Sequence, residues 1–188
     1  MAKAAFLDRD GVLNRKMPEG QYVTRWEEMR FLPGAAEAII LLRQAGFRVI
    51  VVSNQRCVAK GLLSVEELES MHRRMCQRFA ATGAKIDAVY YCPHDSEPAC
   101  PCRKPAPGLL LQAAREHQID LESSWMIGDT MSDMEAGRRA GCKTALLQAA
   151  AERRTGLADV IAPSLLEAAH GILNRKHSGA IYSSTASR

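Results

Sequence analysis

Short apolar runs alternate with helix-like segments along most of the chain, and this order restricts the fold more than any other sequence feature. Ser64 followed by Glu67 resembles a helix capping box, and Gly46 suits a helix stop. Strands that alternate with helices favour a mainly parallel sheet covered on both faces, so we expect a three-layer α/β sandwich. The expected strands cover 4–7, 49–52, 86–91, 125–127, 144–147 and 159–161, and the expected helices cover 35–46, 64–81, 107–117, 131–140 and 164–173.

Length and composition indicate one domain. With 188 residues, 47% of them apolar, the chain is long enough for one packed core and short for two. We expect that domain to cover 1–174 and the polar stretch 175–188 to be a disordered tail. The short gaps between the polar motifs described below leave no room for a separate cap domain, so we expect an open crevice.

Charge and hydropathy argue against several classes of function. The net charge is +4, but Arg175, Lys176 and Arg188 lie in a stretch without acids, so the rest is nearly neutral and nucleic-acid binding gains little support. No apolar run approaches the length of a membrane span, and no secretory leader opens the chain. We therefore expect a monomeric cytoplasmic protein that binds neither nucleic acid nor membrane.

Polar residues gather directly after the expected strands. In an open parallel sheet, ligands bind beyond the carboxyl ends of the strands, so these residues are the first candidates for a site. The strand ends and their following loops supply Asp8, Asp10 and Gly11, then Ser53, Asn54 and Gln55, then Arg103 and Lys104, and finally Asp129 and Asp133.

These residue types suit phosphate chemistry. A carboxylate such as Asp8 can attack phosphorus while Asp10 handles protons, provided that Mg²⁺ relieves the charge repulsion, with Asp129 as a further ligand. Ser53 offers a hydroxyl and Lys104 a positive charge to the phosphoryl group. Taken singly, the acids also fit turn, cap or helix-dipole roles, Ser53 and Asn54 fit a turn, and Lys104 fits a solvated surface.

The order of these motifs, strand-DxDG, strand-SN, KP and strand-GDxxxD, resembles that of the haloacid dehalogenase superfamily phosphatases from about residue 4 to residue 147. The resemblance implies a Rossmann-like haloacid dehalogenase fold. It also implies that Asp8 forms an aspartyl-phosphate and that Asp10 is the general acid and base. By the same resemblance Ser53 and Lys104 bind phosphate, and Asp8, Asp10 and Asp129 bind Mg²⁺ with support from Asp133.

A second motif joins three cysteines and a histidine. Cys92, His94, Cys100 and Cys102 offer three thiols and an imidazole within eleven residues, with prolines that stiffen the loop. This set matches a closed tetrahedral zinc site, whose role would be structural; two buried thiols and an idle histidine are the alternative. We predict that Zn²⁺ shapes the loop 92–102, which leads to Arg103 and Lys104.

The segments FLDRDGVLN, VVSNQ, YYCPH, CPCRKPAPG and IGDTMSDM closely resemble those of the D-glycero-D-manno-heptose-1,7-bisphosphate 7-phosphatases. That resemblance implies removal of the 7-phosphate from a sugar bisphosphate in nucleotide-activated heptose biosynthesis. It also implies a substrate-binding set of Ser53, Asn54, Gln55, Arg103 and Lys104, with Arg103 recognising the bisphosphate.

Some positions depart from the family pattern. Arg56-Cys57 and Lys60-Gly61 stand where the heptose enzymes usually have Ser-Gly and Arg-Gly, and Thr130 stands where they often have Lys. Histidinol-phosphate phosphatases share the zinc loop and the catalytic motifs. A histidinol-phosphate phosphatase and a broad sugar-phosphate phosphatase therefore remain alternatives, and an inactive zinc-stabilised binding module is the alternative outside enzymes.

Overall fold

The computed structural model describes residues 1–97, 100–148 and 156–178, with side chains described to Arg175. Its sheet has six parallel strands in the order β3-β2-β1-β4-β5-β6. The strands are β1 (Lys3–Leu7), β2 (Phe47–Asn54), β3 (Ala88–Cys92), β4 (Trp125–Gly128), β5 (Lys143–Leu147) and β6 (Val160–Ala162). The expected α/β class with a parallel sheet is confirmed.

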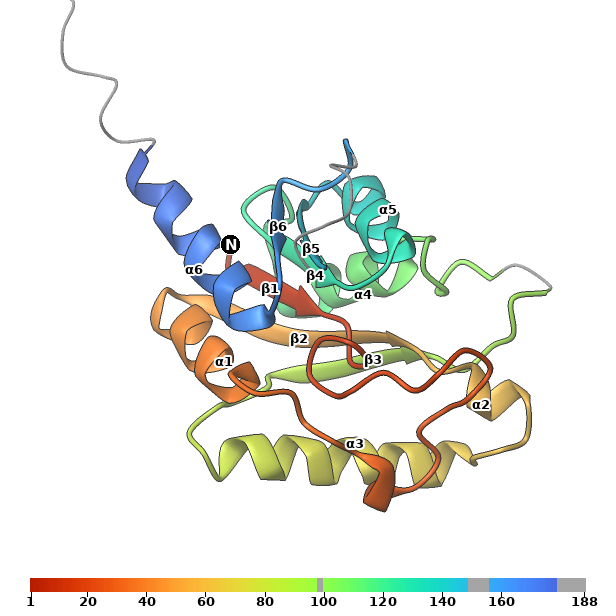
Figure 1. Ribbon diagram of the computed structural model, residues 1–188. Helices are drawn as coiled ribbons and strands as arrows, with labels where there is room; N and C mark the ends of the chain where they lie inside the picture. Colours follow the sequence, from red (N-terminus) through yellow and green to blue (C-terminus); the bar gives the residue numbers. More distant parts are fainter. Residues whose placement is uncertain (98–99, 149–155, 179–188) are drawn as a thin grey trace, which may run out of the picture.

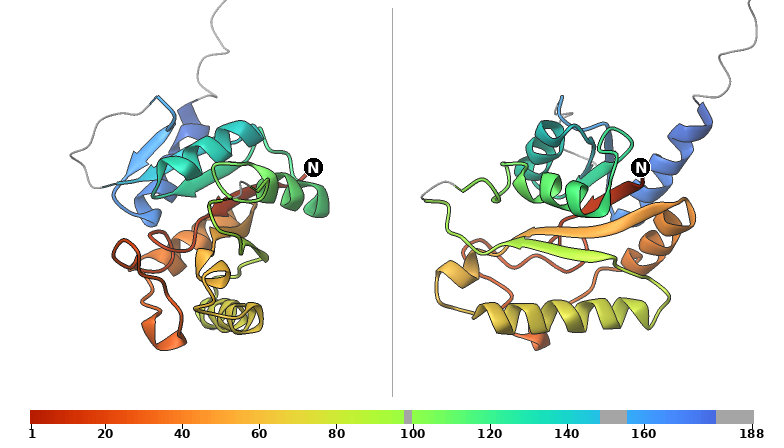
Figure 2. Two further views of the ribbon diagram at one scale, coloured as in Figure 1. Left: turned by 90° about the vertical axis from the view of Figure 1, so that its right-hand side faces the viewer. Right: turned by 180° about the vertical axis from the view of Figure 1, so that it is seen from behind.

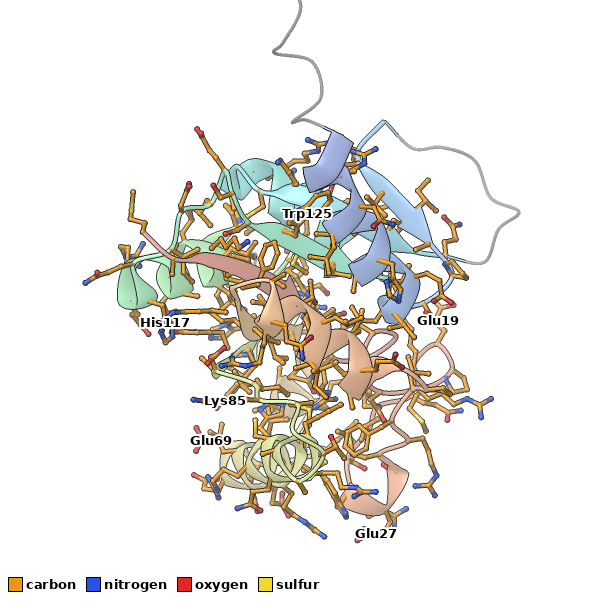
Figure 3. All side chains as sticks on the ribbon, turned by 90° about the vertical axis from the view of Figure 1, so that its left-hand side faces the viewer. Glu19, Glu27, Glu69, Lys85, His117 and Trp125 are labelled. Atoms are coloured by element: carbon orange, nitrogen blue, oxygen red, sulfur yellow. The ribbon has the colours of Figure 1, made fainter. Side chains whose placement is uncertain are left out.

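Helices cover both faces of this sheet (Figure 1). One face packs α1 (Ala35–Gln44), α3 (Val65–Ala80) and α6 (Leu165–Ser178), and the other packs α4 (Gly108–His117) and α5 (Met131–Ala140). Figure 3 shows the two sides through labelled residues: His117, which ends α4, and Glu19, in the loop after β1, lie on opposite sides of the sheet. None of the described helices is long and apolar enough to cross a membrane.

Alternation along β1 explains the two cores. Ala5 and Leu7 point into the cluster under α1, α3 and α6, whereas Ala4 and Phe6 point into the cluster under α4 and α5, and all four are fully buried. A central parallel strand is buried on both faces and therefore reads as an unbroken apolar run.

Some element boundaries differ from expectation. β3 begins at Ala88 instead of residue 86, because the carboxylate of Asp87 accepts a hydrogen bond from Val49 N at 2.8 Å just before the ladder starts. The closing helix α6 extends past residue 173 to Ser178, into the stretch expected to be a tail, while 179–188 lie outside the described residues. A 3-10 turn, η1 (Trp26–Glu28), and a short helix, α2 (Arg56–Ala59), were not expected.

The sheet order places a crevice between β1 and β4. After β1 the chain builds β2 and β3 on one side, and it then returns to build β4, β5 and β6 on the other side. Ligands bind at such a switch point, beyond the carboxyl ends of the strands. The loop after β1, the helix α2 and the loop after β3 gather at this end of the sheet (Figures 1 and 2), and no separate cap domain stands over them in the described residues.

Candidate active site

A cavity of about 240 Å³ lies at the switch point. It is lined by residues of the loop after β1, by the end of β2 and by the first turn of α5. The structure thereby brings together most of the residues that the strand-end argument singled out. The lining residues are Asp8, Arg9, Asp10, Lys16, Met17, Pro18, Glu19, Gly20, Gln21, Tyr22, Val23, Ser53, Asn54, Gln55, Lys104, Thr130, Ser132 and Asp133.

Lys104 is a buried cation held between two carboxylates. Its Nζ lies 3.0 Å from Asp8 Oδ1 and 2.6 Å from Asp133 Oδ1, and it donates to Val52 O at 2.7 Å. Burial acts to lower the pKa of Lys104, but Asp133 and Asp8 outweigh burial and raise the pKa to about 12. Burial raises the pKa of Asp8 to about 7 although Lys104 opposes the rise. The ammonium therefore stays charged at neutral pH beside the candidate nucleophile.

Asp8, Asp129 and Asp133 form a carboxylate cluster. One oxygen from each lies within 4.8 Å of the others, which is the spacing of ligands around a metal ion. Asp129 Oδ2 pairs with Lys16 Nζ at 2.6 Å, but the buried Asp129 Oδ1 has no hydrogen-bond partner among the described residues. A buried carboxylate oxygen without a partner is costly, so the cluster fits a hard divalent cation such as Mg²⁺.

This grouping differs from the expected ligand set of Asp8, Asp10 and Asp129. The carboxylate of Asp133 joins the cluster in place of that of Asp10, although only a supporting role was expected for Asp133. Asp133 also caps the start of α5. Its Oδ2 accepts hydrogen bonds from Thr130 N at 3.1 Å and from Thr130 Oγ1 at 2.6 Å. The cap fixes this side chain with its other oxygen toward Lys104.

The Asp10 carboxylate points into a network of donors. Its Oδ2 accepts from Arg9 Nε and Nη2 at 3.1 and 2.7 Å and from Gln55 Nε2 at 3.3 Å, and its Oδ1 accepts from Asn14 Nδ2 at 3.0 Å. Burial acts to raise the pKa of Asp10, but the charge of Arg9 and these hydrogen bonds hold the pKa below its ordinary value. Asp10 is therefore an ionised, firmly oriented carboxylate in this structure.

Asn54 and Gln55 line the cavity, but most of their polar side-chain atoms are hydrogen-bonded to other protein atoms. Asn54 Nδ2 donates to Lys104 O at 3.0 Å, and Asn54 Oδ1 accepts from Lys104 N at 3.1 Å. Gln55 Nε2 donates to Ser53 Oγ at 2.6 Å as well as to Asp10. Asn54 thus anchors the backbone that carries Lys104, a task that sequence spacing does not reveal because the two residues are fifty positions apart.

Arg103 is not among the residues that line the cavity. Its Nη1 donates to the carbonyl oxygen of His94 at 3.3 Å, so in this structure the guanidinium braces the loop that precedes it. The expected substrate contact of Arg103 therefore stays a prediction. Lys16 and Tyr22 also line the cavity from the loop after β1, and the sequence motifs did not single them out.

The cysteines and histidine of the loop after β3 converge. Cys92 Sγ lies 3.5 Å from both His94 Nδ1 and Cys100 Sγ, and Cys102 Sγ lies 3.3 Å from His94 Nδ1 and 3.0 Å from Cys100 Sγ. These sulfur separations exceed a disulfide bond length, which is about 2.05 Å. The four ligand atoms lie within 4.8 Å of one another, which suits a tetrahedral metal ion.

Known proteins resemble this chain in both sequence and fold. A family model described as HAD-hydrolase-like matches residues 101–168. The D-glycero-β-D-manno-heptose-1,7-bisphosphate 7-phosphatase of Pseudomonas aeruginosa is 38% identical over 149 residues, which cover 79% of this chain and 83% of that protein. The enzyme of the same name from Vibrio cholerae is 37% identical over 188 residues, which cover 94% of this chain and 100% of that protein.

A solved structure extends the likeness to three dimensions. The crystal structure of the D,D-heptose 1,7-bisphosphate phosphatase from B. bronchiseptica, complexed with magnesium and phosphate, superimposes with a TM-score of 0.83 at 32% sequence identity. The match covers 92% of this chain and 99% of that one.

The parallel sheet, its switch-point crevice and these matches define a phosphatase of the HAD-like class, as the motif order predicted. Within that class, the chain belongs to the family of the D-glycero-β-D-manno-heptose-1,7-bisphosphate 7-phosphatases.

Proposed function

We propose that this protein removes the 7-phosphate of D-glycero-β-D-manno-heptose 1,7-bisphosphate, as the names of its relatives indicate for them. The observation that carries the proposal is the pair of the buried Lys104 and the partly buried Asp8, 3.0 Å apart at the cavity. A cation fixed beside a candidate nucleophile is the arrangement that binds a phosphoryl group and stabilises its charge during transfer.

In the proposed mechanism, Asp8 attacks phosphorus and Asp10 manages the proton. Asp10 is ionised in the substrate-free structure, so it must first take up a proton from solvent. As the bond between phosphorus and the sugar oxygen breaks, Asp10 gives this proton to the leaving oxygen, and an aspartyl-phosphate remains on Asp8. Water then attacks phosphorus, Asp10 takes a proton from that water, and inorganic phosphate leaves. Lys104 and the Ser53 hydroxyl hold the phosphoryl oxygens throughout.

Two groups of side chains in the structure could bind the metal ions that this proposal includes. Asp8, Asp129 and Asp133 would hold Mg²⁺, which the partnerless Asp129 Oδ1 and the magnesium-containing relative support. When bound, the ion reduces the repulsion between the carboxylates and the substrate phosphate. Cys92, His94, Cys100 and Cys102 would hold Zn²⁺, which shapes the loop that delivers Lys104.

A substrate panel tests the function. We expect Mg²⁺-dependent phosphate release with a catalytic efficiency for the β-heptose bisphosphate well above that for the α anomer or for histidinol phosphate. Asp8→Asn should abolish turnover and leave the fold intact, because an amide is not an anionic nucleophile.

Three results would contradict this proposal. A preference for histidinol phosphate would move the assignment to that related class, and substantial turnover by Asp8→Asn would exclude the covalent mechanism. Release of the anomeric phosphate, with the 7-phosphate retained in the product, would show that the enzyme binds the sugar in the opposite direction.

A further inference from the structure

Arg9 is a buried cation beside the candidate general acid. Only 1% of its surface is exposed, and it is among the largest fully buried side chains of the residues that the structure describes. Two of its nitrogen atoms donate to Asp10 Oδ2. A buried guanidinium is costly unless its remaining donors also find acceptors, so the partner of its third nitrogen matters.

That partner is His72, which reaches Arg9 from the middle of α3. Arg9 Nη1 lies 3.3 Å from His72 Nε2. Because a guanidinium has donors only, His72 Nε2 must accept, and the ring proton must therefore reside on Nδ1. Burial lowers the pKa of His72 to about 3, with Arg9 adding to this effect and Asp10 opposing it, so the ring is neutral as the contact requires.

The contact restricts how the guanidinium can turn. The group is planar and rigid, and its nitrogens are engaged by Asp10 on one side and by His72 on the other. His72 is itself held, being 5% exposed and packed against the Tyr91 ring at a centroid distance of 5.4 Å. Without the acceptor on α3, Arg9 would keep its charge attraction to Asp10 but lose its fixed orientation.

We propose that His72 is a positioning residue: through Arg9 it holds the Asp10 carboxylate in the orientation from which Asp10 transfers protons. The inference rests on the role given to Asp10 in the proposed function. It assigns a task in the reaction to α3, an element that otherwise only covers the sheet.

The leaving group of the substrate distinguishes this role from a merely structural one. A sugar oxygen needs a proton as it departs, whereas the nitrophenolate of p-nitrophenyl phosphate departs without one. We expect His72→Leu to lower kcat/KM for the heptose bisphosphate about tenfold or more and to change kcat/KM for p-nitrophenyl phosphate less than about threefold. His72→Gln keeps a carbonyl acceptor and should recover most of the loss.

Met75→Leu is the matched control, since Met75 is a fully buried α3 residue and the substitution conserves volume. It should leave both substrates unaffected. Equal losses on both substrates without recovery in His72→Gln, or no loss in His72→Leu, would overturn the proposal.

Nitrogen NMR of the wild-type imidazole gives a test that needs no turnover. At neutral pH we expect a neutral ring protonated on Nδ1; a proton on Nε2 or a charged ring would refute the contact itself. Failure of the proposed function is distinguishable, because a wild type inactive on every phosphate ester would still show the Nδ1 proton.

Discussion

Glycine at position 11 lets two site segments approach each other. Its φ is +87°, and a Cβ there would lie 2.4 Å from Asp129 Cγ. We expect Gly11→Ala to lower the free energy of unfolding by about 1–3 kcal/mol and to weaken Mg²⁺ binding about tenfold or more, because Asp129 must move out of the carboxylate cluster. Calorimetric titration with Mg²⁺ measures the second effect.

Gly141→Ala is a control that distinguishes the strain of a positive φ from the clash of the added Cβ with Asp129. Gly141 has nearly the same φ, +88°, and a Cβ there meets no atom within 4 Å. This control should lose stability but bind Mg²⁺ as the wild type does. Wild-type Mg²⁺ affinity in Gly11→Ala would show that Asp129 does not serve the metal.

His72 should also make the fold sensitive to acid. The pKa of His72 is about 3 in the folded protein and near its ordinary 6.5 once unfolded, so between these values the unfolded chain binds the extra proton. The contribution of His72 to stability is therefore unchanged above pH 6.5 and falls as pH drops, by up to about 1.4 kcal/mol per pH unit.

Urea unfolding of the wild type and His72→Gln from pH 7 to pH 4 checks this dependence. The variant lacks the titrating ring, so the stability difference between the two proteins should shift in favour of His72→Gln as pH decreases. Parallel curves would mean that His72 has the same pKa in the folded and unfolded states, as an exposed ring does.

At the scale of elements, periodicity predicted most of the sheet and its covering helices. The capping box of Ser64 and Glu67 is present at the start of α3, and α5 covers the expected residues. α2 escaped prediction because four residues make a single turn, too short to show a helical period. β3 begins late because a side chain, Asp87, replaces a ladder partner, which no alternation pattern encodes.

The loop after β3 should depend on its metal. We expect one Zn²⁺ per chain in protein purified without chelator, and we expect Cys102→Ser to lower the melting temperature before it lowers activity, because metal binding is coupled to loop folding. Metal analysis and thermal unfolding measure both effects. Cys76→Ser, a change at a thiol outside the cluster, is the control, and absence of zinc would reject the structural site.

At the scale of the whole molecule, the sequence predicted which residues meet at the crevice but not how their carboxylates are grouped. Strand-end position was enough to place Asp8, Ser53 and Lys104 around one crevice, because parallel strands end at one edge. The exchange of Asp133 for Asp10 in the carboxylate cluster was not predictable, since it depends on side-chain directions set by Arg9 and by the cap of α5.

Recognition of a bisphosphate requires a second phosphate-binding group, and the family resemblance implies that Arg103 supplies it. A guanidinium can make a forked contact with a second phosphate, and histidinol phosphate has no second phosphate to offer. For this contact Arg103 must leave the carbonyl of His94, an exchange that a partly exposed side chain permits. We expect Arg103→Ala to lower catalytic efficiency for the heptose bisphosphate about ten- to a hundredfold and that for monophosphates much less.

The ratio of catalytic efficiency for the heptose bisphosphate to that for a monophosphate, measured together with the melting temperature, distinguishes a substrate-binding role of Arg103 from a role in stabilising the loop. Arg115→Ala, a change at an exposed arginine on α4, is the control and should alter neither substrate. Equal losses on both substrates together with a lower melting temperature would show that Arg103 only holds the loop through His94. The second phosphate would then have to be bound by other cations at the crevice, of which Lys16 already lines the cavity and is half exposed.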